Sequence, residues 1–292
     1  MSDKNWLRRY ILRCGVMEQN GFEIGNIDSA KETALHVSFN IEKSDSETSN
    51  TAKVQIWNLS DENLRVLDTQ DCIVELRAGY YDNLALILVG NITSVDTSAD
   101  NADRMTELEV VDGRVELRDT TISCSFNGIV NCQQVYDHIS QQMGLPIIYA
   151  PDLTYKMLPN GFSFAGTGKS ALQKLANCCG HAWTIQNQVI QITWPGRPIS
   201  AMGYLLNSDT GLIDVPKRVT IGASNSTDES HTGWEVKYFL NGNIGINDIV
   251  YLESKKVSGY FRVCKITFEG DNQESDWTCT AQLLEIKADS TK

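Results

Sequence analysis

The feature that most constrains the fold is an alternation of apolar and polar residues between residues 35 and 59. Its apolar positions are Leu35, Val37, Phe39 and Ile41, then Ala52, Val54 and Ile56, with eight polar residues (43–50) between the two halves. A period of two is typical of a strand with one buried and one solvated face. Two such runs joined by a short polar segment predict a β-hairpin, so the chain must build a sheet around it.

Composition describes a globular protein and excludes several classes of partner. The 292 residues suffice for two or three domains, and 41% are hydrophobic and 21% charged. The net charge of −12 argues against binding to free nucleic acid or anionic membranes. No apolar run of about 18 residues exists to span a membrane, and basic residues interrupt the short apolar run at the N-terminus, which favours a first strand over a signal peptide.

The eight cysteines include no C-x-x-C pair, and the adjacent Cys178 and Cys179 cannot easily bond to each other. Buried, reduced thiols are therefore favoured over disulfides or a metal site. We expect no metal and no cofactor, and assembly in a reducing cytoplasm.

Strand-like segments occupy both ends of the chain. In the N-terminal region they are 6–14, the hairpin 35–59, 72–78, 84–95 and 105–111, with a short helix that Ser60 caps. In the C-terminal region they are 217–221, 234–240, 249–253, 260–268 and 277–286, and the polar segment 222–233 is expected to be an exposed loop. Turn-rich separators between short strands predict compact antiparallel barrels or sandwiches.

The middle of the chain changes to a helical period twice. The apolar faces are Cys132, Val135, Tyr136, Ile139 and Met143 in the first helix, and Ala171, Leu172, Leu175, Ala176 and Cys179 in the second. Gly144 and Gly180 are placed to end these helices, and strands are expected at 146–149, 181–185 and 189–193. We predict a fold that is mainly β (α+β overall): a β-barrel over 1–115, an α+β insert over 116–195, and a linker (194–204) leading into a second β-barrel within 196–292.

The two β regions echo each other. Each region contains the same series: an acidic residue, a strand, a turn, a second strand, an acidic turn and a closing strand. The series starts at Asp71 in the first region and at Asp248 in the second. The spacing from Ile92 to Leu108 equals that from Val263 to Cys279. Two superposable barrels are the hypothesis, and two unrelated small β domains of similar spacing are the alternative.

No catalytic constellation stands out. Residues 165–170, AGTGKS, resemble part of a phosphate-binding loop, but position 163 is Ser163 where the first glycine should be, which favours a plain helix start. None of the four histidines has metal-ligand spacing. His181 follows the two adjacent cysteines, although a turn residue is the commoner role. Asp228, Ser230 and His231 lack signs of an oxyanion hole. We expect no enzyme.

Three stretches resemble the family of phage tail baseplate hub proteins. They are 34–58, the run GYYDNLALILVGNITSV within 72–95 followed by ELEVVDG at 107–113, and 210–266 with TGLIDVPKR, NDIVYL and SGYFRVCKI. The middle segment FSFAGTGKSALQKLANCCGHAWTIQNQVIQI is similar to the α+β insert of that family. The resemblance therefore covers most of the chain, without a catalytic signature.

This resemblance implies a structural role and a set of protein partners in the phage tail. The family builds a homotrimeric ring from two tail-tube-like barrels per subunit, so that three chains present six barrels to the sixfold tail tube. The expected partners are tail tube or tube-initiator proteins above, a central spike protein below, and wedge and tape-measure proteins. DNA would pass through without specific binding. The protein would be assembled in the bacterial host cytoplasm and end in the virion, in the tail baseplate. A carbohydrate-binding tail module and a nucleotide-binding or hydrolytic enzyme are the alternatives.

The hairpin supplies the candidate interface. A regular strand pair needs a partner for its edge, so we expect Phe39, Ile41, Val54 and Ile56 to contact a neighbouring subunit, and the 43–50 loop to contact a subunit or the tube.

Overall fold

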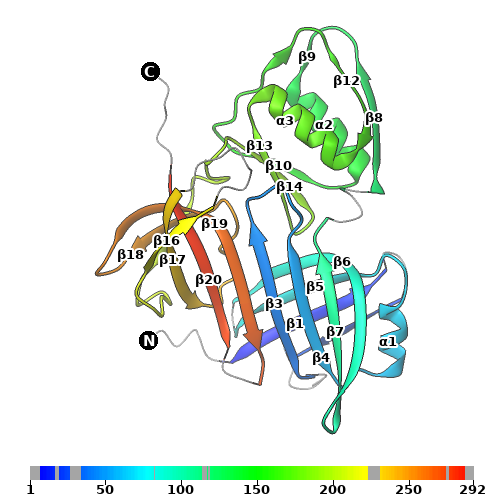
Figure 1. The fold of residues 1–292 in the computed structure, drawn as a ribbon, viewed down its shortest axis with the longest axis vertical. Coiled ribbons are helices and arrows are strands. Elements are labelled where there is room, and N and C mark those ends of the chain that lie inside the picture. The colour runs from blue at the N-terminus through cyan, green and yellow to red at the C-terminus, as the bar shows by residue number, and fades with distance from the viewer. Residues whose placement is uncertain are drawn as a thin grey trace.

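The structure is a computed structural model that describes residues 7–16, 20–26, 34–81, 83–113, 117, 119–222, 231–273 and 276–286. A β-rich body and a smaller α+β insert lie one above the other in Figure 1. The prediction of a mainly β chain with antiparallel pairing is confirmed. Among the described helices, none is both long and apolar enough to cross a membrane.

The N-terminal β region is a five-strand unit with two extra strands. Its hairpin is β3 (Val37–Ser44) and β4 (Thr51–Trp57), and its meander is β5 (Ile73–Tyr80), β6 (Asn83–Asp100) and β7 (Asp103–Val111). The second hairpin strand pairs with the closing strand of the meander, giving the order β3-β4-β7-β6-β5. The strands β1 (Arg8–Gly15) and β2 (Gly21–Gly25) extend the sheet beyond β5. The helix α1 (Asp61–Leu67) begins after Ser60, whose hydroxyl accepts from the amide of Asn63 as expected for a cap.

The C-terminal β region repeats this connectivity. Its hairpin is β16 (Lys217–Ile221) and β17 (His231–Phe239), and its meander is β18 (Ile249–Glu253), β19 (Ser258–Asp271) and β20 (Trp277–Glu285). The order is β16-β17-β20-β19, with β18 on β19. A β-bulge interrupts the middle and closing strands between Ile92 and Ser94 in the first unit, and between Val263 and Lys265 in the second. Ile92 and Val263 are the echoed positions, so the repeat extends to an irregularity of the backbone.

In the part of the chain that the structure describes, the two units do not form separate closed barrels. In the described residues, β3 pairs with β19, and this contact joins both units into one 13-stranded sheet whose path ends at β2 and β16. The outer strands also differ, because β1 adds to β5 antiparallel whereas β15 (Gly203–Leu206) adds to β18 parallel. One cluster of buried side chains serves both units. The alternation that predicts a hairpin reports which face is buried, but not where the sheet ends.

The contact between β3 and β19, which we call the seam, is closely packed. Phe39 lies opposite Gly270, and a Cβ at position 270 would overlap the Phe39 ring. The ring also meets Trp277 edge to face, with centroids 5.3 Å apart. At the end of the seam, Nε2 of His36 lies 2.9 Å from the Asp271 carboxylate. A glycine under an aromatic ring therefore lets the two units approach.

The insert has its own core and a three-stranded sheet. Its elements are β8 (Thr121–Phe126), β9 (Val130–Asn131), α2 (Cys132–Met143), β10 (Ile147–Tyr149), β11 (Met157–Leu158), β12 (Phe162–Thr167), α3 (Gly168–Cys179), β13 (Ala182–Gln186) and β14 (Val189–Thr193). Both helices end at glycines in the left-handed region, with φ of 69° at Gly144 and 76° at Gly180, as expected. Each helix leads into a strand beside β14, β10 parallel and β13 antiparallel to it.

A few expected elements differ in extent. The first strand begins at Arg8, and Trp6 lies outside the described residues. In the expected loop 222–233, residues 231–233 belong to β17 and residues 223–230 lie outside the described part. The last two residues of the expected linker, Gly203 and Tyr204, begin β15. The short strands β2, β8, β9, β11 and β12 were not expected.

Candidate functional site

Residues 165–168, which lead into α3, already use backbone groups in hydrogen bonds within the chain. Thr167 caps the helix and accepts from the amide of Ser170 at 3.3 Å, and the amide of Gly168 donates to the carbonyl of Thr120 at 3.1 Å. Ala165 and Gly166 lie in β12, paired with β8. These backbone amides therefore do not form the cradle that a phosphate-binding loop requires, which agrees with the helix start expected from the sequence.

The four candidate interface residues have buried side chains. Phe39 is 4% exposed, and Ile41, Val54 and Ile56 are each 0% exposed within the core of the β body. Both edges of β3 are used inside the chain, one by β4 and the other by β19. Within the chain, these side chains lie in the core and the C-terminal unit takes the second edge of β3, the place where the sequence led us to expect a neighbouring subunit.

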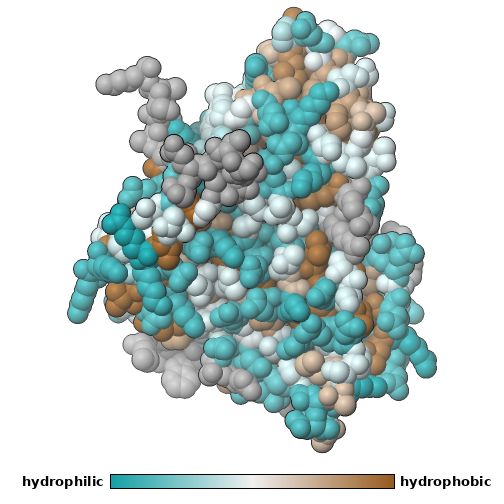
Figure 2. Space-filling model, viewed as in Figure 1, coloured by the Kyte–Doolittle hydropathy of each residue, from teal (hydrophilic) through white to brown (hydrophobic). Residues whose placement is uncertain are grey.

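Free edges and exposed apolar side chains lie elsewhere in the described residues. The strand β15 pairs only with β18 there, and the side chains along and before it are exposed: Met202 80%, Tyr204 37% and Leu205 46%. Hydrophobic residues are visible around β17 and β18 in Figure 2. An exposed apolar edge strand is normally covered by a partner.

The outer face of the central strands is polar and mainly acidic. Rows of paired residues cross β19, β3, β4, β7 and β6, one row running through Glu269, Asn40, Lys53, Glu109 and Ser94. We define the polar face by the charged and amide side chains of these rows: Asn40, Glu42, Lys53, Gln55, Asp96, Glu107, Glu109 and Glu269. Lys53 bridges Glu107 at 3.1 Å and Glu109 at 3.6 Å, and Lys265 of β19 bridges Glu42 at 3.0 Å, which still leaves an excess of carboxylates. Figure 2 shows mostly hydrophilic residues over β3 and β19.

A buried polar junction joins the insert to the β body. The Asp112 carboxylate, 1% exposed, accepts from the amides of Asn187 at 2.6 Å and Gln188 at 2.9 Å. Those two residues form the turn between β13 and β14 and have positive φ, 51° and 61°, the geometry of a tight hairpin turn. The Lys43 ammonium donates to the Asn187 side chain. Two oppositely charged groups of the β body thus hold the tip of the insert hairpin, Asp112 through the turn amides and Lys43 through the Asn187 side chain.

Burial shifts the pKa values of Lys43 and Asp112 toward their neutral forms. It lowers the pKa of Lys43 to about 8, against the opposing effect of the Asp112 charge. It raises the pKa of the Asp112 carboxyl above its ordinary value, against the opposing effects of Lys43 and the turn amides.

The 43–50 loop takes part in the same junction. Gln186 donates to the carbonyl of Ser44 at 2.8 Å, and Asn50 donates to the carbonyl of Ile185 at 3.1 Å. Asp45 pairs with Arg262 of β19 at 2.6 Å. The loop was expected to contact another subunit or the tube, but these residues contact the insert and the C-terminal unit of their own chain.

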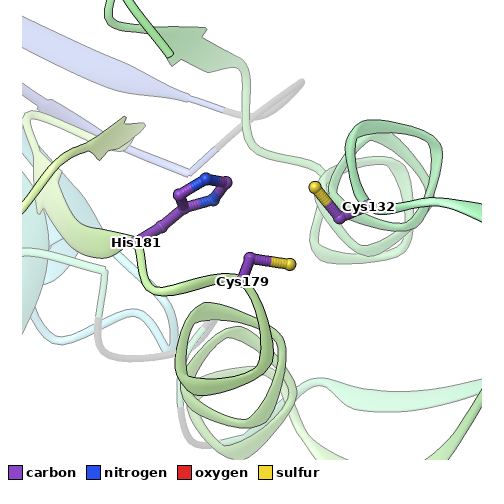
Figure 3. Close-up of side chains that lie close together, drawn as sticks. All are labelled: Cys132, Cys179 and His181. Atoms are coloured by element: carbon purple, nitrogen blue, oxygen red, sulfur yellow. The ribbon is translucent and has the colours of Figure 1, made fainter. Parts of the chain in front are cut away.

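A cluster of two thiols and an imidazole lies inside the insert. The ligand atoms of Cys132, Cys179 and His181 all lie within 4.8 Å of one another. Figure 3 shows Cys132 at the start of α2 facing Cys179 and His181, which lie where the chain leaves α3. Six of the eight cysteines are buried as expected, and Cys179 is half-buried. His181 stands beside Cys179 in the sequence, but Cys132 joins them only through the packing of α2 against α3, which leaves no local spacing signal.

Comparison with known proteins identifies the fold. No family model matches the sequence, and no curated protein matches it. Among solved structures, the 43 kDa tail protein of prophage MuSo2 from Shewanella oneidensis is 12% identical with a TM-score of 0.62, covering 95% of this chain and 96% of that one. A tail protein from Neisseria meningitidis MC58 is 10% identical with a TM-score of 0.63, again covering 95% and 96%.

A third similar structure comes from a secretion machine. The E. coli c3393 protein, a component of the type VI secretion system with structural similarity to the T4 bacteriophage tail proteins gp27 and gp5, is 10% identical with a TM-score of 0.57. The match covers 86% of this chain and 74% of that one. Likeness at these identities establishes a shared architecture over nearly the whole chain, and the function has to be argued from the features above.

Proposed function

We propose that this chain, which has the fold of phage tail proteins, is a structural subunit of a tail baseplate hub. In this proposal three copies form a ring that joins the sixfold tail tube to a threefold central spike. It is a virion component, assembled in the host cytoplasm, and it is not an enzyme. Tail tube or tube-initiator proteins would lie above it, the spike below, and wedge and tape-measure proteins nearby.

The internal repeat is the observation that carries the proposal. Each chain holds two five-strand units with the same connectivity and a bulge at the same echoed position. Three chains in a closed ring would therefore present six similar units at alternating positions. Such a ring can match a sixfold partner on one side and keep true threefold symmetry on the other. The differing outer strands, β1 with β2 in one unit and β15 in the other, would mark which side of each unit meets a neighbouring chain.

The polar face supports a role in the conduit for DNA. It crosses the seam, so both units contribute to one continuous acidic surface. Carboxylates repel phosphate groups, and a channel lined by them would let DNA pass without binding it. We place the polar face toward the lumen of the ring.

Mass measurement of the purified protein tests the trimer. We expect a species of three times 32.5 kDa that caps purified tail tubes in electron micrographs. In Leu205→Glu a charge is added at the exposed edge strand β15, which should shift the protein toward monomer. The matched control is Ile129→Glu on the insert, because Ile129 is also exposed, at 70%, and should leave the mass unchanged. A wild-type monomer that does not bind tubes would refute the proposal.

A further inference from the structure

We propose that Cys132, Cys179 and His181 form a binding site for a thiophilic divalent cation, zinc by its ligand chemistry. The site lies inside the insert and is independent of the assembly role proposed above. Two cysteine sulfurs and one imidazole nitrogen are ligands that zinc prefers, and a solvent molecule would complete a tetrahedral site.

The separation of the three groups suits a site that closes on the ion. Their ligand atoms lie within 4.8 Å of one another. Tetrahedral zinc with ordinary bond lengths places its ligand atoms about 3.4–3.8 Å apart. The contraction needed is therefore at most about 1–1.4 Å, which the half-buried side chain of Cys179 can supply by rotation at the end of α3.

Hydrogen bonds orient the imidazole for binding. Nε2 of His181 lies 3.2 Å from the carbonyl oxygen of Thr154, which can only accept, so Nε2 carries the hydrogen. Nδ1 then keeps its lone pair, and the Tyr136 hydroxyl lies 3.3 Å from it. Tyr136 follows Cys132 by one helical turn on the same face of α2, so this lone pair points toward the helix face that carries Cys132. Metal-ligating histidines commonly donate their second N–H to a carbonyl in this way.

Neighbouring rings hold the imidazole in place. The Trp194 ring meets it edge to face with centroids 5.0 Å apart, and the Tyr136 ring stacks on it at 5.8 Å. The three ligands come from the first residue of α2, the last residue of α3 and the approach to β13. A bound ion would therefore tie both helices of the insert to its sheet, close to the point where the chain leaves for the C-terminal unit.

Cobalt titration of the full-length reduced protein tests the site. We expect one equivalent of Co²⁺ to give thiolate-to-metal charge transfer and the intense visible bands of tetrahedral coordination, which Zn²⁺ then displaces. Cys179→Ser and His181→Asn should abolish these bands and lower zinc affinity by more than about 100-fold, beyond what loss of an outer partner typically costs. Zinc should raise the melting temperature of the wild type but not of Cys179→Ser.

Two variants act as matched controls. Cys178→Ser removes the adjacent exposed thiol, and Tyr136→Phe removes the hydroxyl that competes for Nδ1 while keeping the ring. Both should bind cobalt at least as tightly as the wild type. Circular dichroism of each variant in chelator separates a loss of ligand from a loss of fold. The proposal is overturned if the reduced wild type shows no tetrahedral spectrum, if the spectrum survives in folded Cys179→Ser, or if Cys178→Ser abolishes it.

Discussion

Replacing Asp112 with Asn should weaken the attachment of the insert to the β body. The carboxylate accepts two amide hydrogen bonds at the turn of the insert hairpin, at 2.6 and 2.9 Å. An Asn side chain keeps one acceptor but turns an NH₂ group toward the other amide. A hydrogen bond to a charged group contributes about 1.5–3 kcal/mol, and the buried Lys43 ammonium would also lose the Asp112 charge that opposes the effect of its burial. We expect the free energy of unfolding to fall by about 2–4 kcal/mol.

Urea unfolding, followed by tryptophan fluorescence, measures this loss. The matched control is Asp209→Asn on an exposed turn, which should change stability by less than about 0.5 kcal/mol. In Asp112→Asn the lysine charge stays buried without its counter-charge, so adding Lys43→Met should recover part of the loss, with a coupling of about 0.5–3 kcal/mol. An Asp112→Asn protein as stable as the control, or strictly additive effects in the double variant, would refute this account of the junction.

Three further changes test other parts of the structure. Burial lowers the pKa of Lys43 to about 8, so between about pH 8 and 10.5 the folded chain holds fewer protons than the unfolded chain. The free energy of unfolding of the wild type, relative to that of Lys43→Met, should therefore rise by about 3 kcal/mol across this window. A difference between the two proteins that does not change with pH in urea titrations would contradict this. Gly270→Val should displace the Phe39 ring at the seam and cost about 1–3 kcal/mol in chemical denaturation, whereas Gly222→Val, with open space around its Cβ, should cost far less. Paired Glu107→Lys and Glu109→Lys changes should slow DNA ejection from virions, followed with a DNA-binding dye, because lysines on the polar face would attract phosphate; ejection as fast as in Asp209→Lys virions would mean that this face does not line the conduit.

Local patterns predicted the elements of this fold well. The alternation around the hairpin identified β3 and β4, and the helical periods with Gly144 and Gly180 identified α2 and α3 with their ends. The spacing echo between Ile92 and Val263 also anticipated the repeated connectivity. Each of these signals is read from residues close in sequence, where backbone geometry leaves a direct trace in the order of side chains.

Contacts between distant segments leave no such trace in the order of residues. Alternation shows that Phe39 and Ile41 are buried, but it carries no information on which strand pairs with the second edge of β3, and the structure shows that β19 of the same chain does. Asp112 carries no local signal, because a buried carboxylate that binds the turn amides of another segment resembles any loop residue in sequence. Cys132 joins Cys179 and His181 for the same reason, through packing of helices that are far apart along the chain.

The seam also has a consequence for the order in which the protein can fold during synthesis. His36 and Asp271, at one end of it, are separated by 235 positions. As the chain leaves the ribosome, the N-terminal unit can form while β19 has not yet been made, and the edge of β3 stays open meanwhile. An open strand edge invites pairing with other nascent chains. Production of the protein should therefore be limited by how quickly the last strands arrive, and shortened chains that end before β19 should aggregate.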